Sequence, residues 1–233
     1  MASIWDIIRD NWLLFLIGQY PHGPIGGLAM TIALAVAGLA LAFPCAVLMA
    51  LARTSASRPL YLASTVLVQI VRGTPLIMVI FWTYFFLPSL TGAPIGGFAT
   101  MVGSIVLYES AYMGEVIRAG IEAIPKGQSE AARALGLGKW QTMLLIVLPQ
   151  ALYNMLPSLI GQFVSIIKET SLGYTISVNE LTFAASQVNA LLLTKPVQVY
   201  TILALTYFAL CFALSQLARM AERRITRRRA ATG

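Results

Sequence analysis

Charged side chains stand at a few positions inside the long apolar stretches of this chain, and these are the positions that could do chemistry. Glu109 lies within one stretch, and the run Lys168-Glu169-Thr170-Ser171 closes another with an ammonium, a carboxylate and two hydroxyl groups. An unpaired charge at the centre of a membrane helix costs ~2.5–3.5 kcal/mol even on the mildest insertion scale. We therefore expect each of these residues either to pair with another side chain or to line a polar path.

Three further charges in apolar surroundings indicate pairing. Glu115 and Arg118 are three residues apart, so they share a helix face and are predicted to form a structural ion pair, the alternative being direct contact with a substrate. Arg72 is predicted to pair with Glu109 or Glu115; the alternative is that its side chain extends to the membrane interface. Glu109 has no residue of opposite charge within one helical turn, which indicates a partner on another helix or a polar cavity.

The chain shows no catalytic or metal-binding pattern. His22 has no second histidine or cysteine nearby, while Cys45 and Cys211 lie in separate apolar stretches and are expected to act as small packing residues. The pair Gly138-Lys139 is followed by Trp140 and not by the Ser or Thr of a phosphate-binding loop. The sequence thus predicts no metal, no cofactor and no enzymatic activity, so any ATP would be hydrolysed by another polypeptide.

The elements that must position these residues are membrane helices. Hydrophobic residues make up 58% of the chain and charged residues 11%, whereas about a quarter of a soluble domain is charged. Apolar stretches of this length, without strict alternation, cross a ~30 Å hydrocarbon core as helices. We predict an all-α membrane protein with about five transmembrane helices, bent at Gly73-Thr74-Pro75. The predicted spans are residues 26–52, 60–88, 98–123, 141–166 and 197–218.

The distribution of positive charge predicts the orientation. Eleven of the sixteen Lys and Arg residues fall in three places: Arg53 and Arg58; Lys126, Arg133 and Lys139; and Arg219, Arg223, Arg224, Arg227, Arg228 and Arg229. By the positive-inside rule these places are cytoplasmic, and five spans then put the N-terminus outside and the C-terminus in the cytoplasm. Three regions are expected: an external or interfacial segment (1–25), a five-span domain (26–218) and a basic tail (219–233). The tail is interpreted as a topology signal that attracts anionic lipid, and not as a nucleic-acid site.

One polar, helix-forming segment, about residues 125–140, lies between the third and fourth predicted spans. Its motif is a Glu-Ala-Ala triplet, a glycine after three residues, and an Ile-x-Leu-Pro sequence after nine more: Glu130, Ala131, Ala132, Gly136, Ile146, Leu148 and Pro149. Small residues permit close approach, and glycine permits a turn that bulkier residues resist. The segment is predicted to dock a soluble partner; the alternative is an amphipathic surface helix without one.

This spacing resembles the signature loop of the permease subunits of bacterial ABC importers. GTPL (73–76), AYMGEVIRAGIEAIPKGQ (111–128) and KETSL (168–172) are similar to the polar amino-acid branch of that family, close to glutamate, aspartate and glutamine permeases. The resemblance covers about residues 26–210. It implies a type I ABC importer permease fold in which the polar segment is a cytoplasmic coupling helix, with Glu130, Ala131, Ala132 and Gly136 at its centre.

The resemblance also implies a function and partners. The chain would move a polar amino acid across the bacterial inner membrane by alternating access. It would act with two ATP-binding subunits, a second permease chain (the same or a related one) and an extracytoplasmic substrate-binding protein. Which amino acid is carried, and whether the two permease chains are identical, is not specified by the sequence.

An amino-acid substrate would suit the polar run, because it carries both a carboxylate and an ammonium group. Lys168, Glu169, Thr170 and Ser171 could bind both, and together with Glu109 they are the predicted lining of the substrate path. The alternative is that Lys168 and Glu169 pair only with each other at the outer end of a span.

Two other classes of protein remain open. A secondary amino-acid transporter would explain the buried charges but not the signature loop. A non-transporting membrane scaffold would explain the loop but not the charged residues inside the spans. Co-purification with an ATP-binding subunit separates both from an importer.

Overall fold

A computed structural model describes residues 4–232, with side chains up to Arg223. Of the predicted terminal segments, residues 1–3 and 233 and the side chains of Arg224, Arg227, Arg228 and Arg229 lie outside the described part. The described residues are helical almost throughout, and their only β-type pairings are two isolated bridges, Gly18 with Ile25 and Gly27 with Glu180. The predicted all-α class is confirmed.

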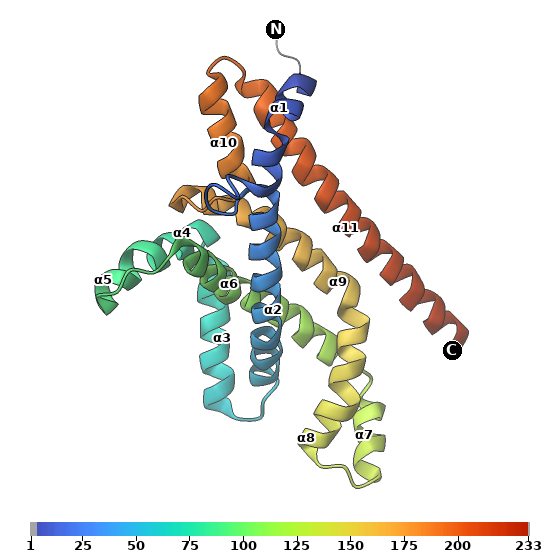
Figure 1. The fold of residues 1–233 in the computed structure, drawn as a ribbon. Helices are drawn as coiled ribbons and strands as arrows, with labels where there is room; N and C mark the ends of the chain where they lie inside the picture. The colour runs from blue at the N-terminus through green and yellow to red at the C-terminus, as the bar shows by residue number, and fades with distance from the viewer. Residues whose placement is uncertain (1–3, 233) are drawn as a thin grey trace.

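The helices of the first half form a bundle with a side arm (Figure 1). Their bounds are α1 (Ile4–Ile17), α2 (Gly27–Arg53), α3 (Arg58–Gly73), α4 (Leu76–Phe81), the π-helix η1 (Trp82–Phe86), α5 (Leu87–Thr91) and α6 (Gly97–Glu122). The predicted second span is not one straight helix, since the chain bends by 103° between α3 and the arm formed by α4, η1 and α5. The predicted bend is thus confirmed, because proline cannot continue the helical hydrogen bonds and biases the preceding residue away from helix.

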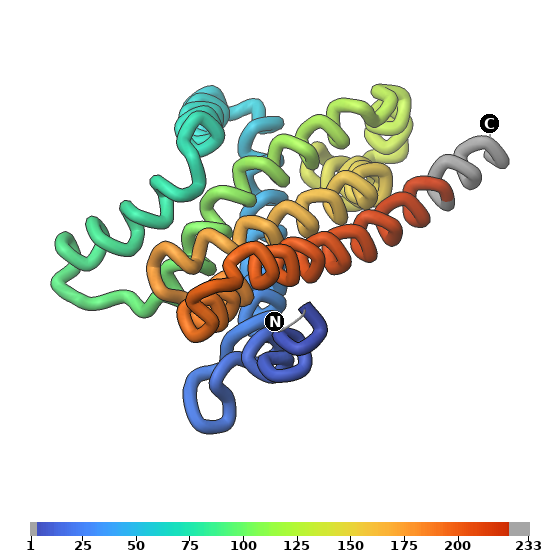
Figure 2. The backbone as a smooth tube through the Cα atoms, turned by 90° about the horizontal axis from the view of Figure 1, so that it is seen from above, coloured from blue at the N-terminus to red at the C-terminus, as the bar shows by residue number. Residues whose placement is uncertain are grey.

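The second half contains the polar segment and two long helices. Its elements are α7 (Lys126–Ala134), α8 (Lys139–Gln141), the π-helix η2 (Thr142–Val147), α9 (Leu148–Glu169), the 3-10 helix η3 (Thr170–Ile176), α10 (Leu181–Leu192) and α11 (Pro196–Thr232). The stretch Lys139–Ile176 is one helical run of 38 residues. It continues beyond the predicted end of the fourth span, so the Lys168–Ser171 run is helical. Figure 2 shows α11 lying along one side of the bundle. The arm formed by α4, η1 and α5 projects at the end of the bundle that lies away from the C-terminus.

Length and composition identify most of the predicted spans. Gly27–Arg53, Lys139–Ile176 and Pro196–Arg223 are each long and apolar enough to cross a membrane, and the bent pair of α3 with the arm makes a fourth candidate. Helix α6 corresponds to the predicted third span and has 26 residues, or about 39 Å. It is less apolar than the four candidates, because it contains glycine, serine and tyrosine residues as well as charged ones. It is packed against α2, α3, α4 and α9, so protein surrounds much of it.

Helix α1 has 14 residues, about 21 Å, which is too short for a ~30 Å core. Trp5 and Trp12 are exposed on it, and it packs on α2, α10 and α11. Its expected position in the membrane interface stays a prediction.

Small residues bring α2 and α6 close together. Gly38, Ala42, Ala46 and Ala50 recur every four residues on α2, and all four are buried. A row of this kind lets two helix backbones approach closely within a membrane. Opposite them, Gly114 of α6 has no room for a side chain: a Cβ atom there would lie 3.1 Å from Met49 Cβ and 3.2 Å from the Ala46 carbonyl oxygen.

Replacing Gly114 with leucine is expected to lower the free energy of unfolding by about 1–3 kcal/mol, because the added atoms overpack this contact. Gly103→Leu on the same helix is the matched control, since a Cβ atom there meets nothing within 4 Å. The measurement is the thermal unfolding midpoint of each variant in detergent. Equal midpoints for the two variants would contradict the α2–α6 packing described here.

Candidate functional site

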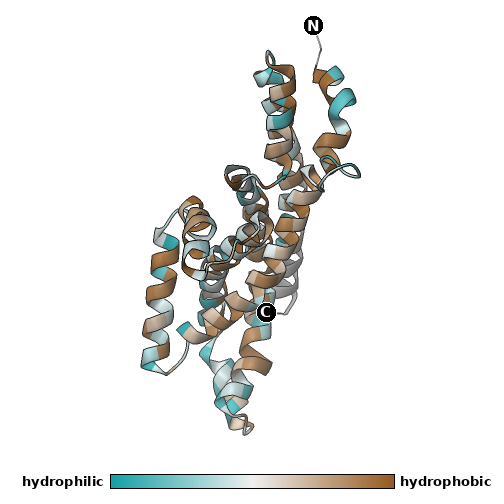
Figure 3. Cartoon of the chain, turned by 60° about the vertical axis from the view of Figure 1, so that its left-hand side comes forward, coloured by the Kyte–Doolittle hydropathy of each residue, from teal (hydrophilic) through white to brown (hydrophobic). Residues whose placement is uncertain are grey.

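The polar segment forms α7 at one end of the bundle, in a hydrophilic stretch (Figure 3). Alanine, glutamate and arginine are good helix formers, and Gly136, whose φ is +86°, follows the end of the helix. The Leu137 amide donates to the Ala132 carbonyl at 3.2 Å and the Gly136 amide to the Arg133 carbonyl at 2.9 Å. This is a Schellman motif, which favours glycine at its left-handed position. The predicted turn at Gly136 is therefore present.

The Glu-Ala-Ala triplet divides between two faces of α7. Glu130 and Ala131 are exposed, whereas Ala132 is 4% exposed and belongs to the side of α7 that packs on η2. Ala132 thus anchors the helix, and the other two residues are available to a partner.

A concave surface lies between α7, the end of α6 and η2. A hollow of about 410 Å³ is lined by Lys126, Glu130 and Arg133 together with side chains of α6 and η2. Just beyond the helix, Leu135 is 85% exposed. An exposed apolar side chain beside a charged, concave surface suits a protein-binding site.

The charged residues at the α7 end of α6 form an ion network with α2. Arg118 Nε donates to Glu115 Oε1 at 3.0 Å, which confirms the predicted pair. Arg53 at the end of α2 binds the other oxygen of Glu115, and Arg118 also binds Glu122. The sequence analysis missed Arg53 as a partner because it lies 62 positions from Glu115. These side chains neutralise one another, which supports the structural interpretation of the pair.

The predicted pairing of Arg72 with Glu109 or Glu115 is wrong. Its guanidinium carbon lies 5.2 Å from the centre of the Tyr112 ring, and the Tyr112 hydroxyl donates to the Arg72 carbonyl oxygen at 3.3 Å. Arg72 is exposed at the end of α3, where a cation–π contact satisfies it. Both oxygens of Glu115 are already bound by other arginines.

Glu109 is 1% exposed, and its partner on another helix is a second acid. The carboxyl groups of Glu109 and Glu169 lie within hydrogen-bonding reach of each other. Gln162 Nε2 donates to Glu109 Oε2 at 3.4 Å. We call these three residues of α6 and α9 the carboxyl cluster. Two carboxyl groups this close share a proton or hold a cation, because two adjacent negative charges repel.

The other predicted path residues do not join the carboxyl cluster. Lys168 is exposed, and no ion pair found in the described part of the chain joins it to Glu169. The Thr170 hydroxyl is buried and donates to the Ile167 carbonyl at 2.7 Å, and the Ser171 hydroxyl donates to the Lys168 carbonyl at 2.6 Å. Four consecutive helical residues point around the whole helix axis, so only one of them can face Glu109.

A second buried acid, Glu180, was not predicted. Its carboxylate accepts hydrogen bonds from the amides of Thr182 (2.7 Å) and Phe183 (2.9 Å) and from the Tyr207 hydroxyl (3.0 Å). It therefore caps α10 and ties it to α11. Burial raises the pKa of the Glu180 carboxyl group, and the hydrogen bonds oppose this shift. In the sequence, the signal for this cap was an acidic residue directly before an apolar, helix-forming stretch.

Comparison with known proteins gives one consistent result. A family model described as a binding-protein-dependent transport system inner membrane component matches residues 42–227. The chain is 34% identical to the L-cystine transport system permease protein TcyB of Bacillus subtilis (97% of this chain, 93% of TcyB). It is also 34% identical to the glutamine transport system permease protein GlnP of Escherichia coli K12 (86% and 92%).

A further relative is longer than this chain. The chain is 36% identical to the inner membrane amino-acid ABC transporter permease protein YhdY of Escherichia coli K12, over 95% of this chain but only 64% of YhdY. It therefore spans less than two thirds of that protein.

Solved structures agree with the sequence comparison. The chain matches a crystal structure of an amino acid ABC transporter with histidines, with a TM-score of 0.83 and 28% identity over 96% of this chain and 99% of the other. A structure of the MetNI methionine ABC transporter, inward facing, matches with a TM-score of 0.65 and 20% identity over 95% of this chain and 99% of that chain, which shows a shared fold. The predicted type I importer permease fold is confirmed.

Proposed function

The chain belongs to the family of binding-protein-dependent transport system inner membrane components, as an amino-acid ABC transporter permease, and we propose that it imports a polar amino acid of the glutamate, aspartate and glutamine class. It is a multi-pass inner-membrane protein and a transport subunit, and in this family a separate subunit hydrolyses ATP. The relative named for glutamine transport supports this substrate class, whereas the one named for L-cystine shows that the family also includes permeases named for other amino acids.

The observation that carries the proposal is the exposed helix α7. A capped, polar helix with an unfilled concave face, at one end of an apolar bundle, suits a soluble partner better than lipid. A secondary transporter works without an ATP-binding subunit and does not need a surface that binds one. We infer that the partners are two ATP-binding subunits, a second permease chain and an extracytoplasmic substrate-binding protein.

The connection from α7 into the bundle suggests how ATP drives transport. Helix α7 packs on η2, and η2 continues into α9, which carries Glu169 at its far end. A displacement of α7 would move this helical run as a unit past α6. Glu169 would then shift relative to Glu109, so the carboxyl cluster would open or close with the nucleotide state, as alternating access requires.

Replacing Gly136 with valine is expected to reduce co-purification of the ATP-binding subunit at least several-fold. The φ of +86° is strained for a β-branched residue, so the end of α7 must change shape. Glu130→Lys, which reverses a charge on the exposed face, should have the same effect.

The matched control is Gly92→Val, because Gly92 has a φ of +70° and open space around it but lies at the end of α5. Membrane insertion should be normal in all three variants. Normal assembly and transport by both α7 variants would reject α7 as the docking element.

The same proposal places α7 and the α2–α3 turn in the cytoplasm. In a chain with Cys45 and Cys211 replaced by alanine, single cysteines at Ser57 and Lys126 should react with an impermeant maleimide only from the cytoplasmic side. Cysteines at Thr91 and Gln187 should react only from outside. External labelling at Lys126 would show that the chain has the opposite orientation. Helix α7 would then lie on the side of the membrane away from the ATPase.

We infer that the carboxyl cluster receives the ammonium group of the substrate. Glu109 and Glu169 come from two helices that move relative to each other in the mechanism above, and a cation between them would relieve their repulsion. Lys168 is exposed one residue away and could meet the substrate carboxylate during passage. Thr170 and Ser171 use their hydroxyl hydrogens within the helix, so we assign them a smaller part.

Exchanging Lys168 and Glu169 is expected to abolish uptake while the subunits still assemble, because the exchange removes the carboxylate facing Glu109. Uptake of labelled glutamate, aspartate and glutamine is measured in proteoliposomes with the binding protein outside and ATP inside. Ser171→Ala is the control and should keep most activity. Normal uptake by the exchanged variant would reject substrate contact by Lys168 and Glu169.

A further inference from the structure

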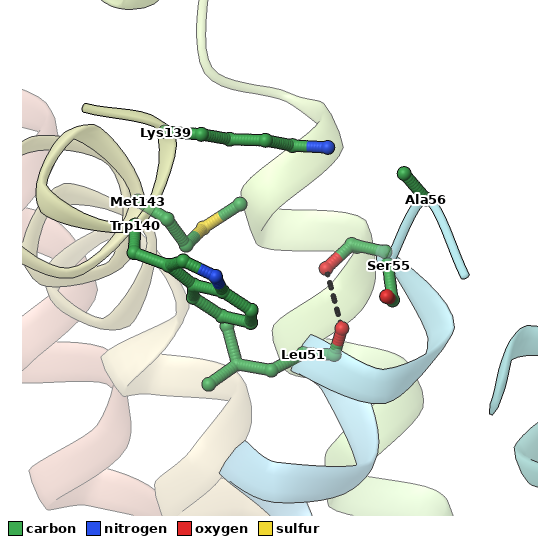
Figure 4. A pocket seen from close by; sticks show the side chains of 7 residues that line it. Leu51, Ser55, Ala56, Lys139, Trp140 and Met143 are labelled. Atoms are coloured by element: carbon green, nitrogen blue, oxygen red, sulfur yellow. Dashed lines mark hydrogen bonds between the residues drawn. The ribbon is translucent and has the colours of Figure 1, made fainter.

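A second hollow lies near the α7 end of the bundle, where the α2–α3 turn meets α8 (Figure 4). Its volume is about 240 Å³, and it is lined by Leu51, Thr54, Ser55, Ala56, Lys139, Trp140 and Met143. These residues come from two segments more than eighty positions apart. The hollow is separate from the carboxyl cluster. It adjoins the hollow beside α7, because Met143 lines both, but none of its other lining residues belongs to that hollow.

The polar groups that line this hollow are mostly hydrogen-bond donors. The Lys139 side chain reaches across it in Figure 4, and none of the ion pairs of the described residues engages that ammonium group. No described hydrogen bond uses the Trp140 indole or the hydrogen of the Ser55 hydroxyl, whose oxygen accepts from the Ser57 amide at 3.1 Å. No acidic residue lines the hollow. A ligand with several acceptor oxygens and a negative charge fits this set.

The other walls of the hollow are apolar. Leu51, Met143 and the Trp140 ring face it, and Trp140 is 64% exposed. Tryptophan prefers the boundary between lipid and water, and lysine can extend its apolar stem along lipid while its ammonium group stays at the headgroups. A free anion would leave these apolar walls exposed to water, whereas a lipid would cover them.

We propose that this hollow binds the phosphate headgroup of an anionic phospholipid. Lys139, Ser55 and the Trp140 indole hold the phosphate oxygens, while Leu51 and Met143 contact the glycerol and the start of the acyl chains. A zwitterionic lipid also carries a phosphate, but its cationic group finds no carboxylate among the lining residues. This proposal requires only that the protein lies in a membrane, and it is independent of which substrate is carried and in which direction.

Quenching of Trp140 by brominated lipid tests the proposal. The full chain is placed in nanodiscs containing brominated phosphatidylglycerol or brominated phosphatidylcholine, and the Trp140 signal is taken as the difference from Trp140→Phe. Half-quenching is expected at an about fivefold lower lipid fraction for phosphatidylglycerol than for phosphatidylcholine, because one lysine near an anionic surface strengthens binding by about this factor. Lys139→Ala should abolish this preference while its quenching by phosphatidylcholine stays normal, which also shows that the variant is folded.

Arg58→Ala removes an exposed positive charge of the α2–α3 region that does not line the hollow, and it should keep the preference. Equal losses in the two variants would indicate general attraction and reject a site. An excess of inorganic phosphate that removes the preference would identify a phosphate site instead of a lipid site. Loss of quenching in the transporter assembled with its ATP-binding subunits would show that a subunit covers the hollow, which also overturns the proposal.

Discussion

Helix α6 carries four charged residues, Glu109, Glu115, Arg118 and Glu122, into an apolar bundle, and it can do so because α2 lets its backbone come close. The row of small residues on α2 and Gly114 on α6 leave no space for lipid between the two helices. Helices α3, α4 and α9 cover other parts of α6. The charged groups therefore meet other side chains, and the carboxyl cluster and the ion network both depend on this arrangement.

The charges on α6 are satisfied in two different ways along its length. Towards α7, Glu115 has two arginine partners and is neutralised. Deeper in the helix, Glu109 meets Glu169 and Gln162, none of which carries a positive charge. A neutral network holds helices in place, whereas two acids in contact leave a demand for a proton or a cation. This difference is the reason for assigning structure to the first group and substrate contact to the second.

One helical run joins α7, the proposed docking element, to the carboxyl cluster, the proposed substrate contact. Lys139–Ile176 starts beside α7, passes through the π-helix η2 and ends beyond Glu169. Single-turn π-helical segments inside longer helices are frequent at functional sites, and η2 is where α7 makes its contact. A movement of the ATP-binding subunits would therefore be transmitted to Glu169 through this one helical run.

The sequence by itself determined the helical class, the positions of the long helices, the bend at Gly73-Thr74-Pro75, the turn at Gly136 and the Glu115–Arg118 pair. These features follow from local chemistry: apolar length, a missing amide hydrogen, a missing Cβ and a three-residue spacing. Only the tertiary structure decided that Arg53 joins Glu115, that Arg72 stacks on Tyr112, that Ala132 is buried and that Glu169 faces Glu109 instead of Lys168. Those contacts depend on the rotation and crossing of helices far apart in the chain, which are decided by packing against small residues and are not encoded in any local spacing.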